Sequence, residues 1–210
     1  MLARLTSDIV WLEKASVTLP DGTQADVLVP KVYVKVREGD LDTRGTLIGA
    51  DSLQLNLTGE LTNQGTLAGR RVVDINAQTV SNLGGWVLGQ NIGVNASGDI
   101  RNLGGVIRAK ERLQLTAGGS IDSSSTRYQT EERAGENLWR REGIARIAGL
   151  YATGPEADVI LNAARKVTLT ASQTEATGSV VITAQGAVTV DSLRTETLER
   201  NYHSEWDQIT

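Results

Sequence analysis

The chain has 210 residues, and its 21 Lys and Arg against 25 Asp and Glu give a formal net charge of −4. It contains no Cys and a single His, His203, which excludes disulfides, a cysteine nucleophile, a thiolate zinc site and any multi-histidine metal site. The slightly acidic balance without a basic block argues against a nucleic-acid partner. We therefore predict no metal, no cofactor and no nucleic-acid ligand.

Residues 1–44 are predicted to form an irregular β segment. Apolar runs at 8–12 and 27–36 indicate short strands, and Asp21-Gly22 between them is a turn signal. We expect these strands to form the first, irregular coils of the repeat that follows. The N-terminus lacks the apolar run of a secretion signal, so we expect the chain to be a segment of a longer protein.

A period of about 20 residues governs 45–124. Within each repeat, as in Leu53 to Leu57, apolar and polar residues alternate, which predicts strands with one buried face. Short strands at this period predict one coil of a β-solenoid per repeat. The repeated positions are Gly45, Gly65, Gly85 and Gly105; Leu47, Leu67, Val87 and Ile107; Leu55, Ile75, Val94 and Leu115; Leu57, Ala77, Ala96 and Ala117; and Leu61, Val80, Ile100 and Ile121.

The predicted fold class is all-β: a right-handed parallel β-helix, or β-solenoid, with coils of about 20 residues and an extra-helical excursion. Asn63, Asn82 and Asn102 each come just before a glycine-containing turn. Stacked coils bring these asparagines together, so we expect a hydrogen-bonded amide ladder at one corner. We expect the glycines to adopt positive φ. A carbohydrate or calcium site is the alternative role for this Asn-Gly column.

The period is interrupted once. Residues 125–157 are rich in charges and fit no coil, and we predict an extra-helical excursion, such as a hairpin on the side of the solenoid. Further coils are predicted at 158–190, where apolar runs recur at 21 residues. Residues 191–210 are predicted to be a polar tail or a cap on the last coil, and their alternating charges suggest pairing with the excursion.

The excursion and the tail also hold the candidate contact residues. Trp, Tyr and Arg are enriched in binding hot spots, and the solenoid faces offer mostly small polar side chains. A purely structural role, in which the large side chains cover the solenoid, is the alternative. The candidates are Tyr128, Trp139, Arg140, Arg141 and Trp206.

Several stretches resemble filamentous haemagglutinin repeats. They include Leu-Gln-Leu-Thr-Ala-Gly-Gly-Ser-Ile (113–121), with the usual strand and Ala-Gly turn of that family, and the stretches 45–55, 61–70 and 100–107. The segments 8–12 and 27–33 look like those that precede such repeats in effectors of contact-dependent growth inhibition. The repeat resemblance covers about 45–190.

The resemblance implies a protein secreted to the bacterial cell surface through an outer-membrane transporter of two-partner secretion. In such systems of Gram-negative bacteria a filament presents or helps to deliver a C-terminal toxin, and it contacts the surface or outer membrane of a target cell. We therefore expect a non-catalytic stalk or adhesin segment without a small-molecule substrate. A host-cell adhesin of the filamentous haemagglutinin type is the alternative.

A β-helical carbohydrate-active enzyme is a third hypothesis, from a different functional class. Such an enzyme needs several carboxylates that converge on one face. The carboxylates here fall at different repeat positions and should point in different directions, so we predict no catalytic residues. The carboxylates considered are Asp51, Glu60, Asp74, Asp99 and Glu111.

Overall fold

The computed structural model describes residues 9–18, 24–33, 46–135 and 137–200 of the chain. The regular structure in these ranges is entirely β-strand, so they offer no helix that could cross a membrane. The chain divides into two units, Met1–Thr43 and Arg44–Thr210.

The first unit is an antiparallel hairpin. Strand β1 (Ile9–Thr18) pairs with β2 (Gln24–Tyr33) along the full length of both strands. The prediction that these strands form irregular coils was therefore wrong. A connection this short suits an antiparallel pair, whereas parallel strands need a crossover of a dozen residues or more. The predicted Asp21-Gly22 turn and the end of the 27–36 run lie outside the described residues.

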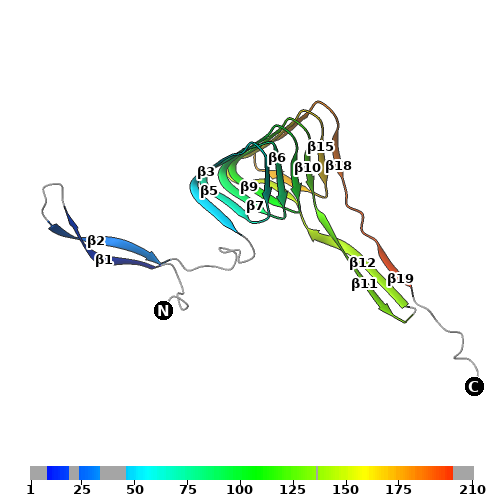
Figure 1. The fold of residues 1–210 in the computed structure, drawn as a ribbon, viewed down its shortest axis with the longest axis horizontal. Helices are drawn as coiled ribbons and strands as arrows, with labels where there is room; N and C mark the ends of the chain where they lie inside the picture. Colours follow the sequence, from blue (N-terminus) through cyan, green and yellow to red (C-terminus); the bar gives the residue numbers. More distant parts are fainter. Residues whose placement is uncertain (1–8, 19–23, 34–45, 136, 201–210) are drawn as a thin grey trace, which may run out of the picture. The chain divides into compact units, whose positions relative to one another are not determined.

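The second unit contains a β-solenoid built from two parallel sheets, whose stacked strands are visible in Figure 1. Each coil contributes one short strand to the smaller sheet and one long strand, or two shorter ones, to the larger sheet. The smaller sheet holds β4 (Glu60–Asn63), β6 (Thr79–Leu83), β8 (Ile100–Leu103), β10 (Ile121–Ser124), β15 (Val167–Thr170) and β18 (Val188–Asp191). The larger sheet holds β3 (Leu47–Asn56), β5 (Thr66–Ala77), β7 (Trp86–Ala96), β9 (Val106–Ala117), β13 (Gly149–Ala152), β14 (Asp158–Ala163), β16 (Gln173–Ala176) and β17 (Val180–Ala184).

The strand register confirms two of the predicted columns in full. Leu55, Ile75, Val94 and Leu115 pair in sequence across the larger sheet, as predicted. The column that begins at Leu61 is confirmed in the smaller sheet. The column predicted to begin at Leu57 is confirmed from Ala77 to Ala117. In the column predicted to begin at Leu47, Ile48 rather than Leu47 pairs with Leu67. The predicted position was one residue off because the first coil has 19 residues at this point, not 20.

These columns form the core of the solenoid. Ile75, Leu115 and Leu161 have no exposed surface, because neighbouring coils cover them on both sides. Burying one such side chain fully stabilises a fold by about 1.5–3 kcal/mol. The stacked aliphatic side chains therefore fill the core of a chain that has no Phe.

The asparagine ladder is present. The side-chain amide of Asn63 donates to Asn82 Oδ1 at 2.8 Å, and the amide of Asn82 donates to Asn102 Oδ1 at 2.8 Å. Among the glycines of these turns, Gly84 and Gly104 have positive φ, as predicted, whereas Gly65, Gly85 and Gly105 do not. Gly85 has a different role, because a Cβ there would lie 2.5 Å from Asn63 Nδ2.

The excursion leaves one coil and returns to the next without breaking the stack. After β10, strands β11 (Thr126–Ala134) and β12 (Asn137–Arg146) form an antiparallel hairpin. The chain rejoins the larger sheet at Gly149, where β13 pairs with the first half of β9 and β14 pairs with its second half. The range outside the solenoid is therefore shorter than the predicted 125–157. The core continues across the insertion because Leu150 pairs with Ile107 and Leu161 pairs with Leu115, and both leucines are fully buried.

The tail pairs with the excursion, as its alternating charges suggested. Strand β19 (Thr197–Arg200) joins the free edge of β12 in antiparallel register. The described part of the tail leads away from β18 to this edge (Figure 1) and leaves the last coil uncovered. Val190 in β18 is 76% exposed, so the described residues of the tail do not form the alternative that we considered, a cap.

Candidate functional site

The candidate site is the hairpin sheet, defined as strands β11, β12 and β19 in that order. Residues that are opposite each other in antiparallel strands lie on the same face, and successive residues alternate between faces. The register therefore defines two faces. The aromatic face carries Tyr128, Thr130, Glu132, Trp139, Arg141, Thr197 and Glu199. The arginine face carries Arg127, Gln129, Glu131, Arg133, Leu138, Arg140, Glu142, Ile144, Leu198 and Arg200.

The structure separates the predicted contact residues. Tyr128, Trp139 and Arg141 share the aromatic face, whereas Arg140 is on the arginine face. Trp206 lies outside the described residues. The candidates therefore do not form one surface: a partner that contacts Trp139 from one side leaves Arg140 on the other.

The aromatic side chains are held by their strand neighbours. Trp139 is half-buried, and its indole Nε1 donates to Glu199 Oε1 of β19 at 3.3 Å. The ring of Tyr128 covers Gly143 on β12, where a Cβ would lie 2.5 Å from a ring carbon. Both contacts join adjacent strands, which supports a structural role for the two aromatic residues within the sheet.

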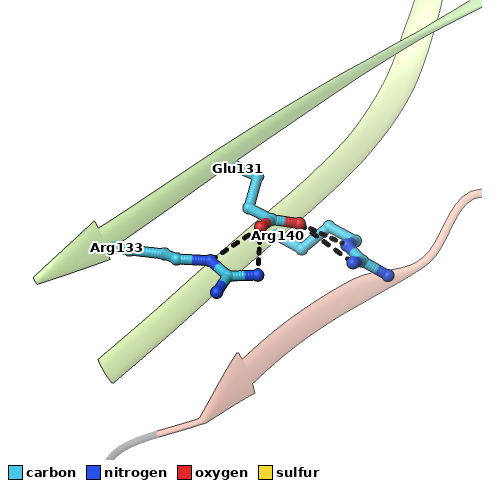
Figure 2. A network of polar contacts seen from close by, with 3 residues as sticks. All are labelled: Glu131, Arg133 and Arg140. Atoms are coloured by element: carbon cyan, nitrogen blue, oxygen red, sulfur yellow. Dashed lines mark hydrogen bonds and ion pairs between the residues drawn. The ribbon is translucent and has the colours of Figure 1, made fainter. Parts of the chain in front are cut away.

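On the arginine face, a carboxylate lies between two guanidinium groups (Figure 2). Arg140 donates to Glu131 Oε2 through Nε at 3.1 Å and Nη2 at 2.9 Å, and Arg133 Nε donates to Oε1 at 2.9 Å. These hydrogen bonds, first that of Arg140 and then that of Arg133, lower the pKa of Glu131. Glu131 is therefore ionised at neutral pH.

The arginine side chains on this face are more exposed to solvent than the carboxylates that they contact. The Glu131 side chain is 28% exposed, against 69% for Arg133 and 40% for Arg140. Glu142 and Arg127 repeat the arrangement at a looser distance of 4.0 Å, with side-chain exposures of 22% and 56%. The outermost charged layer of this face is therefore cationic.

The arginine face was not predicted as a unit, because Arg127, Arg133 and Arg200 were outside the predicted site. The signal that could have found two of them is alternation: the positions of Arg127 and Arg133 differ by six, an even number, so these residues share a face once the segment is known to be a strand.

The solenoid faces carry larger side chains than we expected. Trp86 is exposed on the larger sheet, and Tyr151 on the same sheet has the guanidinium of Arg108 5.1 Å from its ring centroid. Burial, and then the negative charge of Glu175, raise the pKa of Tyr151. Tyr151 also donates to Gln173 on the next coil. These contacts join neighbouring coils.

Each carboxylate of the enzyme hypothesis has a partner of its own. The prediction that they all fall at different repeat positions was wrong for one pair, because Glu60 and Asp99 each directly precede an apolar residue of the column that begins at Leu61. Asp51 pairs with Arg71, Glu60 accepts from Ser81, and Asp99 pairs with Arg101. Asp74 accepts from Asn76. Glu111 accepts from Gln90 and Asn91 on the preceding coil, and these hydrogen bonds, first that of Gln90 and then that of Asn91, lower the pKa of Glu111. In the described ranges no group of three or more His, Asp or Glu side chains is placed to hold a metal ion.

Comparison with known proteins assigns the solenoid to a family. A family model described as haemagglutinin repeat matches residues 21–125 and 152–192, which is more than half of the chain. The gap between the two matched ranges contains the β11–β12 hairpin, so the family pattern excludes the same segment that leaves the coil. No curated protein and no solved structure matches the chain. The matched repeats and the solenoid that they build show that the chain belongs to the haemagglutinin-repeat family.

Proposed function

We propose that this chain is a non-catalytic segment of a secreted filament on the bacterial cell surface, where it serves as a stalk and carries the hairpin sheet as its contact surface. Haemagglutinin-repeat proteins are typically secreted surface filaments. The observation that carries the proposal is the aliphatic column from Leu55 to Ile182, whose members pair from coil to coil and across the insertion.

The last coil supports the stalk role. Val188 in this coil is 48% exposed, whereas its paired residue Val167 is fully buried. An apolar side chain at a core position of this coil suits another layer of β-structure stacked upon it.

The finer form of the proposal is contact-dependent growth inhibition. The filament reaches the surface through an outer-membrane transporter of two-partner secretion, contacts the surface or outer membrane of a target cell, and presents a C-terminal toxin. Its support is the resemblance of 8–12 and 27–33 to the segments that precede the repeats in such effectors. Host-cell adhesion is the second candidate, because the exposed hairpin sheet would serve either target.

Growth competition with a native producer strain tests the proposal. We compare the intact gene, a deletion of the gene, removal of residues 86–105, which is one coil, and removal of residues 127–145 of the hairpin. Intact and coil-deleted filaments should both reach the surface and inhibit neighbouring bacteria. Loss of the hairpin should preserve surface display and reduce inhibition.

Two results would contradict parts of the proposal. If neighbouring bacteria grow equally beside the intact and gene-deleted strains, and the filament binds host cells through the hairpin, host adhesion would replace growth inhibition as the proposed function. Loss of surface display after removal of one coil would contradict a repetitive stalk.

A further inference from the structure

The hairpin sheet is a single layer. Within the described part of the chain, its three strands pair only with one another, and no strand of the solenoid joins the sheet. In β11, every residue after Thr126 is exposed. Three-stranded sheets gain independent stability from packing of an apolar face, so a partner layer would stabilise this one.

The two faces differ in charge. Four arginines and two glutamates give the arginine face a net charge of +2, whereas one arginine and two glutamates give the aromatic face −1. Because Arg133 and Arg140 are more exposed than Glu131, an approaching surface meets the guanidinium groups first. The charge of the arginine face therefore complements an anionic partner.

The arginine face also contains aliphatic side chains. Leu138 and Leu198 are half-buried on neighbouring strands, and Ile144 is exposed farther along β12. Cations interspersed with aliphatic groups on a flat surface are suited to a membrane interface, where the arginines reach the headgroups and the apolar groups reach the acyl boundary. A deep pocket is not required for this mode of binding.

We propose that the arginine face binds the phosphate-bearing surface of an anionic membrane. Guanidinium groups bind phosphate oxygens in bidentate geometry, and the sheet holds Arg127, Arg133, Arg140 and Arg200 so that several can bind at once. The inference rests on the proposed role of the hairpin sheet as the contact surface. It adds the face that makes the contact and the chemistry of its partner.

The sheet places a matched control beside the proposed residues. Arg140 and Arg141 are adjacent in the sequence and lie on opposite faces. If only the net charge of the chain mattered, replacing either arginine would weaken vesicle binding equally. The proposal instead predicts that replacing Arg140 weakens binding more than replacing Arg141. The test variant is Arg133→Gln with Arg140→Gln, and the control is Arg141→Gln with Arg101→Gln, which removes the same charge from the aromatic face and the solenoid.

The experiment is vesicle co-sedimentation of the purified chain. Vesicles of phosphatidylcholine are compared with vesicles that also contain phosphatidylglycerol, at low and high salt. We expect binding to the phosphatidylglycerol vesicles alone, weakened by salt, reduced about tenfold in the test variant and within about twofold of the intact chain in the control. Glu131→Gln, which removes a carboxylate and retains both arginines, should bind more tightly.

Circular dichroism of each variant confirms the fold before binding is compared. Equal losses in the test and control variants, no gain with Glu131→Gln, or no preference for anionic vesicles would overturn the inference. Full competition by millimolar inorganic phosphate would also overturn it, because the site would then take a free anion. These results leave the stalk proposal intact, since that proposal is tested by surface display and growth competition.

Discussion

The solenoid and the hairpin sheet are both built of β-strands, but different interactions hold them. In the solenoid, inward side chains such as Leu115 are buried between coils on both sides. In the hairpin sheet, exposed ion pairs such as Arg133–Glu131 join residues on one face. The comparison shows that alternation with aliphatic residues gives a buried core, whereas alternation with charged residues gives a sheet whose side chains meet in exposed ion pairs.

This difference predicts unequal stability along the chain. A buried aliphatic side chain contributes about 1.5–3 kcal/mol, whereas an exposed ion pair contributes about 0–1 kcal/mol. Local opening follows the regions with few buried contacts. We therefore expect the hairpin sheet to open while the solenoid stays folded.

The largest effect is expected from Ile75→Asp. Ile75 has no exposed surface, and a carboxylate there is buried without a partner, so we expect a loss of several kcal/mol in the free energy of unfolding. Because each coil contacts only its neighbours, amide protection should fall most in β3, β5 and β7. Denaturant unfolding and hydrogen exchange measure both quantities. Val72→Asp is the control, because Val72 is exposed on the same strand.

Asn82→Ala should have the next largest effect. The side chain of Asn82 accepts from Asn63, and it donates to Asn102 and to the Gly85 carbonyl oxygen at 3.0 Å, all in buried surroundings. Its removal leaves polar groups without partners, at a cost of about 2–3 kcal/mol in the free energy of unfolding. Asn95→Ala, in an exposed amide ladder, should change this energy by less than about 0.5 kcal/mol. Equal losses in the two variants would show that the buried ladder has no special role.

Gly104→Ala tests the junction between the two regions. Gly104 has a φ of 59°, and a Cβ there would lie 2.9 Å from the Cβ of Arg146 and 3.0 Å from Thr126 Oγ1 at the base of the hairpin. We expect a loss of about 1–2 kcal/mol in thermal or denaturant unfolding, with faster exchange at the base of β11 and β12. Gly59→Ala, whose Cβ meets nothing within 4 Å, is the control and should cause no loss.

The smallest effect concerns acid pH and the hairpin sheet. The pKa of Glu131 is lowered in the folded state by Arg140 and Arg133. Its contribution to stability is therefore complete above the ordinary glutamate pKa and is lost as pH falls through the lowered value. We expect amides of β11 and β12 to lose protection relative to β9 in this acidic range. Glu131→Gln should weaken that dependence, and an unchanged pH profile in this variant would assign it to another group.

The regular part of the fold could be predicted from the sequence because one physical signal repeats. Ile75 and Val94 are both apolar, lie one coil apart and alternate with polar neighbours, so period and burial agree. The signal failed at Leu47, where a 19-residue coil shifts the register by one position. It also failed at β1 and β2, because local apolar patterns do not distinguish an antiparallel hairpin from two stacked coils.

The candidate site was less predictable. Alternating charges suggested that the tail pairs with the excursion, and β19 does pair with β12. To predict that Arg140 and Arg141 lie on opposite faces, one must know where the strand begins and ends. Strand propensity alone does not give these boundaries in such a polar segment. The return of the chain to the core at Gly149 depends on pairing with β9, a contact between residues more than 40 positions apart.

Hydrogen exchange on a hairpin-deleted chain tests the central claim, that the solenoid is continuous and independent of the hairpin sheet. Residues 127–145 are replaced by a short Gly-Ser link between Thr126 and Arg146, which pair at the base of the hairpin. If the solenoid is continuous, protection of β9, β13 and β14 is unchanged in the deleted chain. Loss of protection in these three strands would contradict it and would make the hairpin sheet a structural part of the stack.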